Sequence, residues 1–332
     1  MNRHLKIAVF PIVIMVRVYR RVRLSWRLFA YDKRRFIRHA GVFHPESRSA
    51  SIARIVMGYH VLEKGITMPR RHLDFGHAAV ENLIELVETF EKRFPDGDGQ
   101  VDHAIGCIKE YLQIHKDAGF DRAGAYWARL KAFCAAHPHV ATACQRKCSR
   151  AEFYKDLNGP FPAFAASRHT VRHYSGMVPV DAIKRAVELA MKAPSACNRQ
   201  YVKVYCISDH TKRDAIYALQ NGNRGFGSDA DKLLAVTADL SGIRWAEERN
   251  DAYTNAGIVL MNLSYALHYG KIAHCILNWS VHPQSDRKAH AILGIPEHEV
   301  IAALVACGNA PEEFLVASSP RKPIGAVFSE IV

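Results

Sequence analysis

The sequence predicts an α+β protein in which an all-helical N-terminal region precedes a sheet flanked by helices. Residues 50–135 carry apolar residues at helical spacing, and no segment among them has the pattern of a strand. From residue 178 onward, helical segments alternate with short apolar runs of the kind found in buried strands. The 332 residues are 49% hydrophobic and 23% charged, which is the composition of a chain that buries a core.

The first 40 residues form a basic tail with an amphipathic pattern. They hold eleven Lys and Arg residues against one acidic residue, Asp32, so most of the net charge of +13 lies here. The apolar stripe comprises Met15, Val18, Tyr19, Val22, Trp26 and Phe29, and the arginines mostly on the opposite arc are Arg17, Arg20, Arg21, Arg23 and Arg27. A basic helix with an aromatic face suits an anionic membrane surface, so we expect residues 12–29 to bind one.

Other interpretations of the tail are weaker but distinct. The ten-residue apolar run at 7–16 is shorter than the roughly 20 residues that span a bilayer. Arginines rather than a small-residue cleavage site follow it, so a signal peptide is not expected. A helix docked on the rest of the protein, or a frayed tail, is the alternative to membrane binding. Nucleic acid ranks last, and we expect no such partner, because aromatic residues for base stacking are not interleaved with the arginines.

The remaining chain divides into a helical region at 41–160 and a second domain at 161–332. The first region's expected helices are 52–62, 77–94, 103–119 and 123–137. Gly65 and Pro69 are expected to end the first helix, and residues 158–167, with two prolines and a glycine, are expected to form the linker. The second domain's expected helices are 178–193, 210–221, 251–270 and 285–294, and its expected strands are 201–208, 232–240, 272–280 and 299–309.

Eight cysteines are scattered along the chain, several of them in apolar runs, which is typical of buried thiols in a reducing compartment. We therefore expect a cytoplasmic protein, peripheral at the inner face of the membrane if the tail binds lipid. Cys134, His137, Cys144 and Cys148 crowd into one stretch, but their spacing matches no paired zinc-binding pattern. Ordinary thiols are favoured, and a metal site is the alternative.

The sequence predicts a phosphate-binding segment that is built from arginines and a hydroxyl rather than from a glycine-rich loop. Residues 221–227 have the glycines but lack the lysine and hydroxyl pair of a P-loop, and no G-x-G-x-x-G turn follows a strand. Arg168, Thr170 and Arg172 lie just before an expected helix. Two guanidinium groups and a hydroxyl match the oxygens of a phosphate monoester, because arginine presents its donors as a planar fork.

Two more segments add groups of matching chemistry. Asn198 and Gln200 follow a Pro-Ser turn, and side-chain amides, which both donate and accept hydrogen bonds, match the edge of a heterocycle such as a flavin. Arg321 supplies another guanidinium after the last expected strand. The motifs "RHTVR" (168–172) and "APSACNRQ" (193–200), with Arg321, resemble the nitroreductase family of FMN-dependent oxidoreductases, and the resemblance covers residues 165–330.

The resemblance implies an FMN site between two subunits of a homodimer. Its phosphate side is expected at Arg168, His169, Thr170, Arg172 and Arg321. The other implied residues are Asn198 and Gln200 near the isoalloxazine and ribityl chain, Pro194, Ser195 and Ala196 at the flavin of the partner subunit, Asn223 at the flavin edge, and Leu277 and Asn278 near flavin N5. The apolar stretch 256–267 is expected at the dimer interface.

The implied function is electron transfer from NAD(P)H to an unidentified small-molecule acceptor through alternate reduction and oxidation of FMN. No side chain is assigned as catalytic, because the flavin does the chemistry. The chain departs from the family pattern: Thr170 replaces a serine, Ser319 replaces a lysine, the Pro-Trp after the second motif is missing, and residues 240–253 leave no room for lid helices. The last two of these departures favour the alternative, an FMN-binding or scaffold protein at the membrane surface with little turnover. The stretch 59–65 resembles extensions on nitroreductase-like proteins of bacterial polysaccharide clusters.

Overall fold

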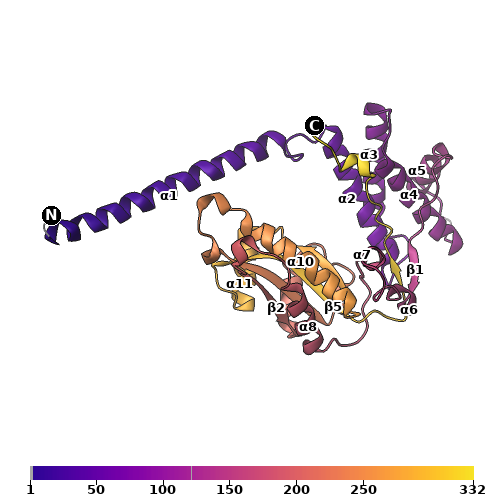
Figure 1. The fold of residues 1–332 in the computed structure, drawn as a ribbon. Coiled ribbons are helices and arrows are strands. Elements are labelled where there is room, and N and C mark those ends of the chain that lie inside the picture. Colours follow the sequence, from indigo (N-terminus) through magenta and orange to yellow (C-terminus); the bar gives the residue numbers. More distant parts are fainter. Residues whose placement is uncertain (1–2, 121) are drawn as a thin grey trace.

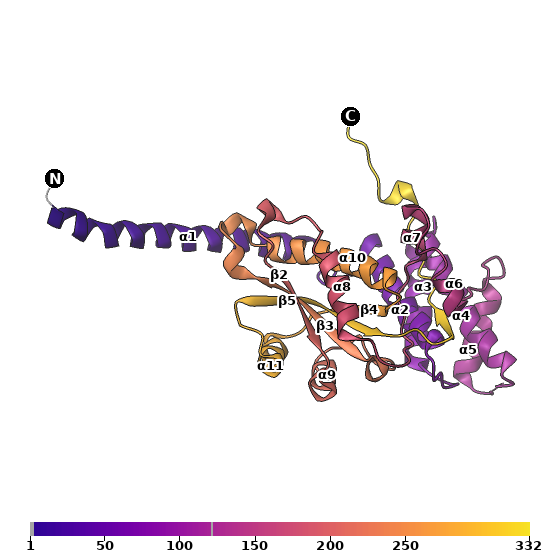
Figure 2. The same ribbon diagram turned by 60° about the horizontal axis from the view of Figure 1, so that its bottom comes forward.

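The computed structural model describes residues 3–332 apart from residue 121, and side chains from residue 14 onward (Figure 1). The side chains of residues 7–13, in the first part of the apolar run, lie outside the described residues. The structure confirms an α+β fold with a helical N-terminal region. It begins with α1 (Arg3–His39), which both views show running away from the rest of the molecule (Figures 1 and 2).

Helices α2 to α5 pack together as the helical region. The helix α2 (Arg48–Thr67) begins where the Ser47 side chain accepts a backbone hydrogen bond from the first turn, and it ends just before Pro69. Gly65 does not end this helix, contrary to expectation: the Phe75 ring lies where a Cβ would be, so the glycine permits close packing inside the helix. The other helices are α3 (His77–Arg93), α4 (Gly99–Asp117) and α5 (Ala125–Ala136).

The helical region has a hydrophobic core of its own. Large apolar side chains from all four helices are at most 1% exposed; they include Ile55, Leu83, Ile84, Ile108 and Leu130. Burying a side chain of this size contributes about 1.5–3 kcal/mol relative to leaving it in water. The region therefore forms a rigid support for the polar residues that α2 and α4 carry on their other sides.

An antiparallel sheet forms the centre of the C-terminal region. Its strands are β2 (Val202–Ile207), β3 (Lys232–Asp239), β4 (Ala273–Asn278) and β5 (Glu299–Gly308), in the spatial order β2-β3-β5-β4. Helices α8 (Val180–Ala190) and α10 (Asp251–Tyr269) cover one face, and α9 (His210–Tyr217) and α11 (Pro283–Leu293) lie on the other (Figure 2). These elements confirm the helices and strands expected for this part of the chain.

Short elements connect the two regions. Strand β1 (Arg146–Ser149) pairs with β6 (Glu313–Val316), a pairing that the sequence did not predict. Helix α6 (Arg150–Phe153) follows β1, and α7 (Phe161–Ser167) occupies the expected linker. Residues 161–167 of the expected linker are helical, because Pro162 falls in the first helical turn, where a backbone N–H has no partner to lose. Single 3-10 turns lie at Ala196–Asn198, Gly227–Asp229, Leu240–Gly242, Ala246–Glu248 and Ile324–Ala326.

The contacts of α1 with the rest of the chain overlap its apolar stripe at Phe29, which lines the same hollow as Leu24. Asp32 accepts a hydrogen bond from the Arg249 guanidinium at 2.8 Å, and Leu24 lines a hollow with residues 240–249. The apolar stripe is open to solvent: Trp26 is 74% exposed and Tyr19 65% exposed. Within the part of the chain that was searched, no helix has both the length and the apolar composition to cross a bilayer.

Candidate functional site

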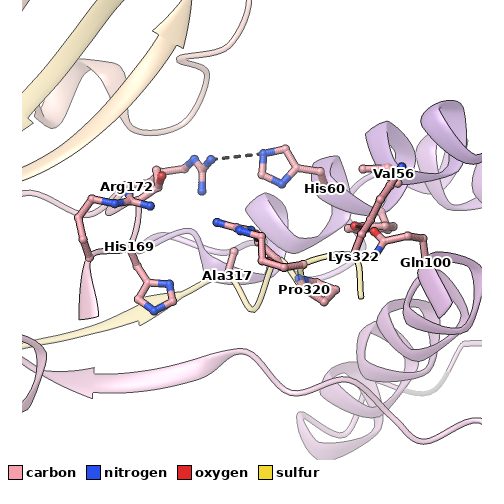
Figure 3. Close-up of a pocket in the computed structure, with 13 residues that line it drawn as sticks. Val56, His60, Gln100, His169, Arg172, Ala317, Pro320 and Lys322 are labelled. Atoms are coloured by element: carbon pink, nitrogen blue, oxygen red, sulfur yellow. Dashed lines mark hydrogen bonds between the residues drawn. The ribbon is translucent and has the colours of Figure 1, made fainter. Parts of the chain in front are cut away.

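A cavity of about 520 Å³ lies between the helical region and the C-terminal region (Figure 3). Three segments far apart in the sequence form its walls: α2 with α4, the extended residues 168–172, and residues 317–322, which we name the C-terminal strap. The lining residues are Val56, Tyr59, His60, Gln100, Arg168, His169, Thr170, Arg172, Ala317, Ser319, Pro320, Arg321 and Lys322. All five residues expected on the phosphate side of a flavin therefore meet in one cavity.

The wall formed by residues 168–172 is held by the edge of the sheet. The Val171 N–H donates to the His274 carbonyl of β4 at 3.0 Å, and the Val171 side chain is fully buried. Side chains alternate along an extended chain, so the burial of Val171 turns its neighbours Thr170 and Arg172 toward the cavity. Sheet pairing thus aims the two polar side chains that the sequence motif singled out.

The cavity is cationic and offers unused hydrogen-bond donors. Arg168, Arg172, Arg321 and Lys322 line it, and of the described residues in its wall none is Asp or Glu. The Nε atoms of Arg168 and Arg172 are buried and have no hydrogen-bond partner among the described residues. An unpaired buried donor is costly, about 1–3 kcal/mol and more for a charged group, and the guanidinium groups of this cavity could hold an anion with several oxygens.

The pKa values in and beside the cavity reflect burial first and the crowding of positive charge second. Burial, with an added contribution from Arg321, lowers the pKa of the Arg168 guanidinium. Burial and the nearby arginine charges lower the pKa of His169 to about 4, so its ring is neutral near pH 7. Burial and the charge of Arg172 lower the pKa of Lys64 on α2. A bound anion would relieve the repulsion among these groups.

The sequence did not identify the contribution of the helical region. Arg172 Nη2 donates to His60 Nε2 at 3.3 Å, which Figure 3 shows as a dashed line across the cavity. Gln100 of α4 and Lys322 of the C-terminal strap also face the cavity. The sequence pointed to this contribution only through the stretch 59–65, which contains His60. A histidine three positions before a glutamate is usually an ordinary surface pair on a helix, so the stretch did not predict a binding site.

The turn at residues 194–200 has unusual backbone geometry but does not line this cavity. Cys197, Asn198 and Gln200 have φ of 51°, 54° and 50°, a left-handed conformation that costs non-glycine residues about 1–3 kcal/mol each. Ser195 Oγ accepts the Gln200 N–H at 3.1 Å, and the Ala196 N–H donates to a buried asparagine of α10 at 2.8 Å. Strain held by such contacts is typical of functional turns, and Pro194 beside it is exposed.

The other expected flavin residues lie near one another at the end of β4, also outside this cavity. Gln220 donates to the Asn278 carbonyl at 3.1 Å, and its side-chain oxygen accepts from Asn223 Nδ2 at 3.0 Å. Asn223 Nδ2 also donates to the carbonyls of Tyr217 and Gln220, so its donors serve the loop. Leu277 is buried and Asn278 exposed. The flavin roles of these residues stay predictions.

The cysteines and histidine considered as zinc ligands do not meet in space. Among the described residues, the group with metal-ligand spacing is Glu63, His103 and Cys107, within 4.8 Å of one another. Burial raises the pKa of the Cys107 thiol well above its usual range, which works against the thiolate that a metal needs. His137 Nε2 faces Glu91 at 3.1 Å, and Cys144 is exposed.

Part of the C-terminal region resembles a known family. The nitroreductase family model matches residues 165–223. No curated protein matches the chain. Among solved structures, the chain is similar to a nitroreductase family protein from Streptococcus pneumoniae TIGR4, with 21% identity and a TM-score of 0.45 over 52% of this chain and 100% of that one. It is also similar to an FMN-dependent nitroreductase from Clostridium difficile R20291, with 18% identity and a TM-score of 0.39 over 45% of this chain and 87% of that one.

The matched residues 165–223 contain the 168–172 segment of the cavity and the strained turn at 194–200. The helical region and the C-terminal strap, which form the other walls, lie outside the match. Residues 165–223 of this chain match the nitroreductase family model, and a helical N-terminal region precedes them.

Proposed function

We propose that the protein is an FMN-dependent oxidoreductase that takes electrons from NAD(P)H and passes them to a small-molecule acceptor. The observation that carries the proposal is the cationic cavity with unpaired buried Nε atoms on Arg168 and Arg172, inside a nitroreductase family domain. A phosphate monoester has the charge and the number of oxygens to accept from both guanidinium groups and from Thr170. We name Arg168, Arg172 and Arg321 the phosphate clamp.

The protein's own residues bind and orient the cofactor in this proposal. The phosphate clamp would hold the phosphate end, and the strained turn at 194–200 would present Asn198 and Gln200 to the rest of the cofactor. FMN, when bound, supplies the two-electron chemistry. No described side chain is assigned as a proton donor or acceptor, so orientation and exclusion of water are the protein's contributions.

The first prediction concerns the purified protein. It is expected to be yellow, with the absorption of a bound flavin, and to take up one FMN per chain on titration. Addition of NADH or NADPH under anaerobic conditions should bleach that absorption. A colourless protein that takes up no FMN contradicts the proposal. Bound FMN that neither nucleotide reduces supports the alternative of a binding or scaffold protein.

We propose that the protein is a homodimer through α10. Tyr253, Ile258 and Met261 of this helix are 56%, 40% and 40% exposed, whereas about half of its residues are buried. Between them Gly257 has open space around it, which leaves room for a side chain from another subunit. Apolar residues in a contiguous stripe on a sheet-covering helix need a partner to leave water.

A substitution in this stripe is expected to separate the subunits. Met261→Glu places a charge where the interface excludes water, and light scattering at micromolar concentration should show a monomer in place of a dimer. Met57→Glu is the matched control, because Met57 is 70% exposed on α2, far from this stripe in the sequence and on the helical region. A dimer that persists in Met261→Glu, or a wild-type protein that is monomeric, contradicts the assignment.

We further propose that the protein acts in the cytoplasm, at the inner surface of the membrane. All eight cysteines are free thiols in the structure, as expected for a reducing compartment. The exposed stripe of α1, beside arginines without acidic neighbours in 14–31, provides the surface for anionic lipid.

A further inference from the structure

A single buried carboxylate of the helical region connects to two arms of the phosphate clamp. Glu63 on α2 has no solvent exposure, although its helix lies outside the nitroreductase family match. Its oxygens face His60 Nδ1 at 3.5 Å, His103 Nε2 at 2.8 Å and Ser318 Oγ at 3.0 Å. The Ser319 N–H also donates to it, at 3.1 Å. Donors from α2, α4 and the C-terminal strap thus converge on one side chain.

The first connection runs from Glu63 through His60 to Arg172. A guanidinium can only donate, so the Arg172 Nη2 contact requires an unprotonated Nε2 on His60. The ring proton then lies on Nδ1, the atom that faces Glu63. This tautomer lets one ring hold Arg172 on one side while the carboxylate orients the ring from the other.

The second connection runs from Glu63 through Ser319 to Arg321. Ser319 has a φ of 40°, a left-handed conformation that a serine adopts only when its surroundings hold it there. Glu63 provides this restraint, since it accepts both the Ser319 N–H and the Ser319 hydroxyl. The Ser319 carbonyl in turn accepts a hydrogen bond from Arg321 Nη1 at 2.6 Å. The direction of Arg321 therefore depends on the conformation that Glu63 stabilises.

The charge of Glu63 suits this role. Burial on its own raises the pKa of the carboxyl, but the hydrogen bonds from His103, His60 and the two serines outweigh it and hold the pKa well below its usual range. The group is therefore ionised near pH 7 and accepts bonds that a neutral carboxyl or amide could not accept from the same donors. It also places a negative charge behind a cavity wall that contains only cations and neutral groups.

We infer that Glu63 is a positioning residue for the phosphate clamp, so that the helical region completes the site for the phosphate end of the cofactor. The inference rests on the proposed FMN function. In this arrangement Ser319, which replaces the lysine of the family pattern, serves to fasten the C-terminal strap to Glu63. The ligand chemistry is that of a phosphate monoester on a larger group.

Comparison of FMN with riboflavin tests this inference, because the two ligands differ only in the phosphate. Glu63→Gln keeps the shape but turns an amide N–H toward the donors of His103 and Ser319. The dissociation constants of both flavins are measured by fluorescence quenching on the full-length apoprotein. We expect FMN affinity to fall roughly tenfold or more, while riboflavin affinity stays unchanged. A purely structural role of Glu63 would weaken both flavins equally.

Glu299→Gln is the matched control. Glu299 is also a buried carboxylate, and it lies on β5. It accepts hydrogen bonds from Thr237 of β3 and Tyr205 of β2, and it does not line the cavity. Its FMN preference should equal that of the wild type. If the wild type binds FMN no better than riboflavin, the phosphate clamp itself is wrong. If the wild type prefers FMN and Glu63→Gln keeps the full preference, the phosphate clamp is still supported. The positioning role of Glu63 is then contradicted.

If Glu63→Gln does not fold, a second pair of variants tests the connection from Glu63 through His60 to Arg172. His60 is partly exposed, so its replacement should be tolerated. His60→Leu removes the connection to Arg172 and is expected to lower the preference for FMN. His60→Gln keeps an acceptor for Arg172 and a donor for Glu63, so it should restore most of that preference. Equal FMN preference in His60→Leu and the wild type contradicts the connection.

Discussion

Arg168→Ala is expected to lose FMN while keeping its fold and its affinity for riboflavin. The guanidinium is half-buried, its Nε has no partner among the described residues, and it faces the cavity between the two regions. Removing one charge-assisted contact to a phosphate costs about 1.5–3 kcal/mol, or roughly ten- to a hundredfold in affinity. Equilibrium titration of the apoprotein with both flavins measures the effect.

Arg185→Ala is the control for that substitution. Arg185 is an exposed arginine of α8 and does not line the cavity, so its removal changes the net charge equally and should leave FMN affinity unchanged. Loss of affinity in both variants would indicate a general charge effect. Unchanged FMN affinity in Arg168→Ala would show that the phosphate lies elsewhere.

Deletion of residues 1–40 is expected to abolish sedimentation with anionic vesicles while FMN binding persists. Each basic residue near an anionic leaflet contributes about 1 kcal/mol, which salt weakens by screening. Burial of the exposed stripe adds about 25 cal/mol per Å². Binding of the full-length protein to phosphatidylserine vesicles should therefore be strong at low salt and partly reversed at high salt.

The deletion also removes the ion pair between Asp32 and Arg249, so a second variant isolates the lipid-facing side. Tyr19→Ser with Trp26→Ser changes two exposed residues and leaves Asp32 in place. This variant should lose most vesicle binding at high salt, where charge contributes least, with thermal stability unchanged. Full-length protein that ignores anionic vesicles even at low salt would contradict membrane binding.

The sheet and most helices could be predicted because their patterns are local. Strand β5 is a continuous apolar run, as expected of a strand covered on both faces, and α8 carries apolar residues on one side only. The pair β1–β6 could not be predicted, since the residues "RKCS" of β1 have no apolar pattern and become a strand only through a partner far along the chain. Likewise, Gly65 was expected to end a helix, because the residues next to it in the sequence do not show that the Phe75 ring packs against it.

The sequence predicted the site residues that belong to a motif, but not the residues from distant segments that complete the site. Arg168, Arg172 and Arg321 were expected together and do meet in one cavity. Glu63 was missed, because a glutamate in a helix with a histidine and a lysine nearby is usually solvated. Only the folded chain shows that its partners are Ser318 and Ser319.

Glu63 and Ser319 lie 256 positions apart in the sequence, so the last wall of the cavity is made late in the synthesis of the chain. The ribosome releases the strap only after the helices and the strands of the central sheet have been synthesised, so these elements can fold before the cavity has its last wall. Closing so large a loop costs little more than closing a moderate one, because the entropic cost grows only with the logarithm of length. Under the proposed function, a chain that stops short of Arg321 lacks one arm of the phosphate clamp, and it forgoes part of the stabilisation that a tightly held ligand gives.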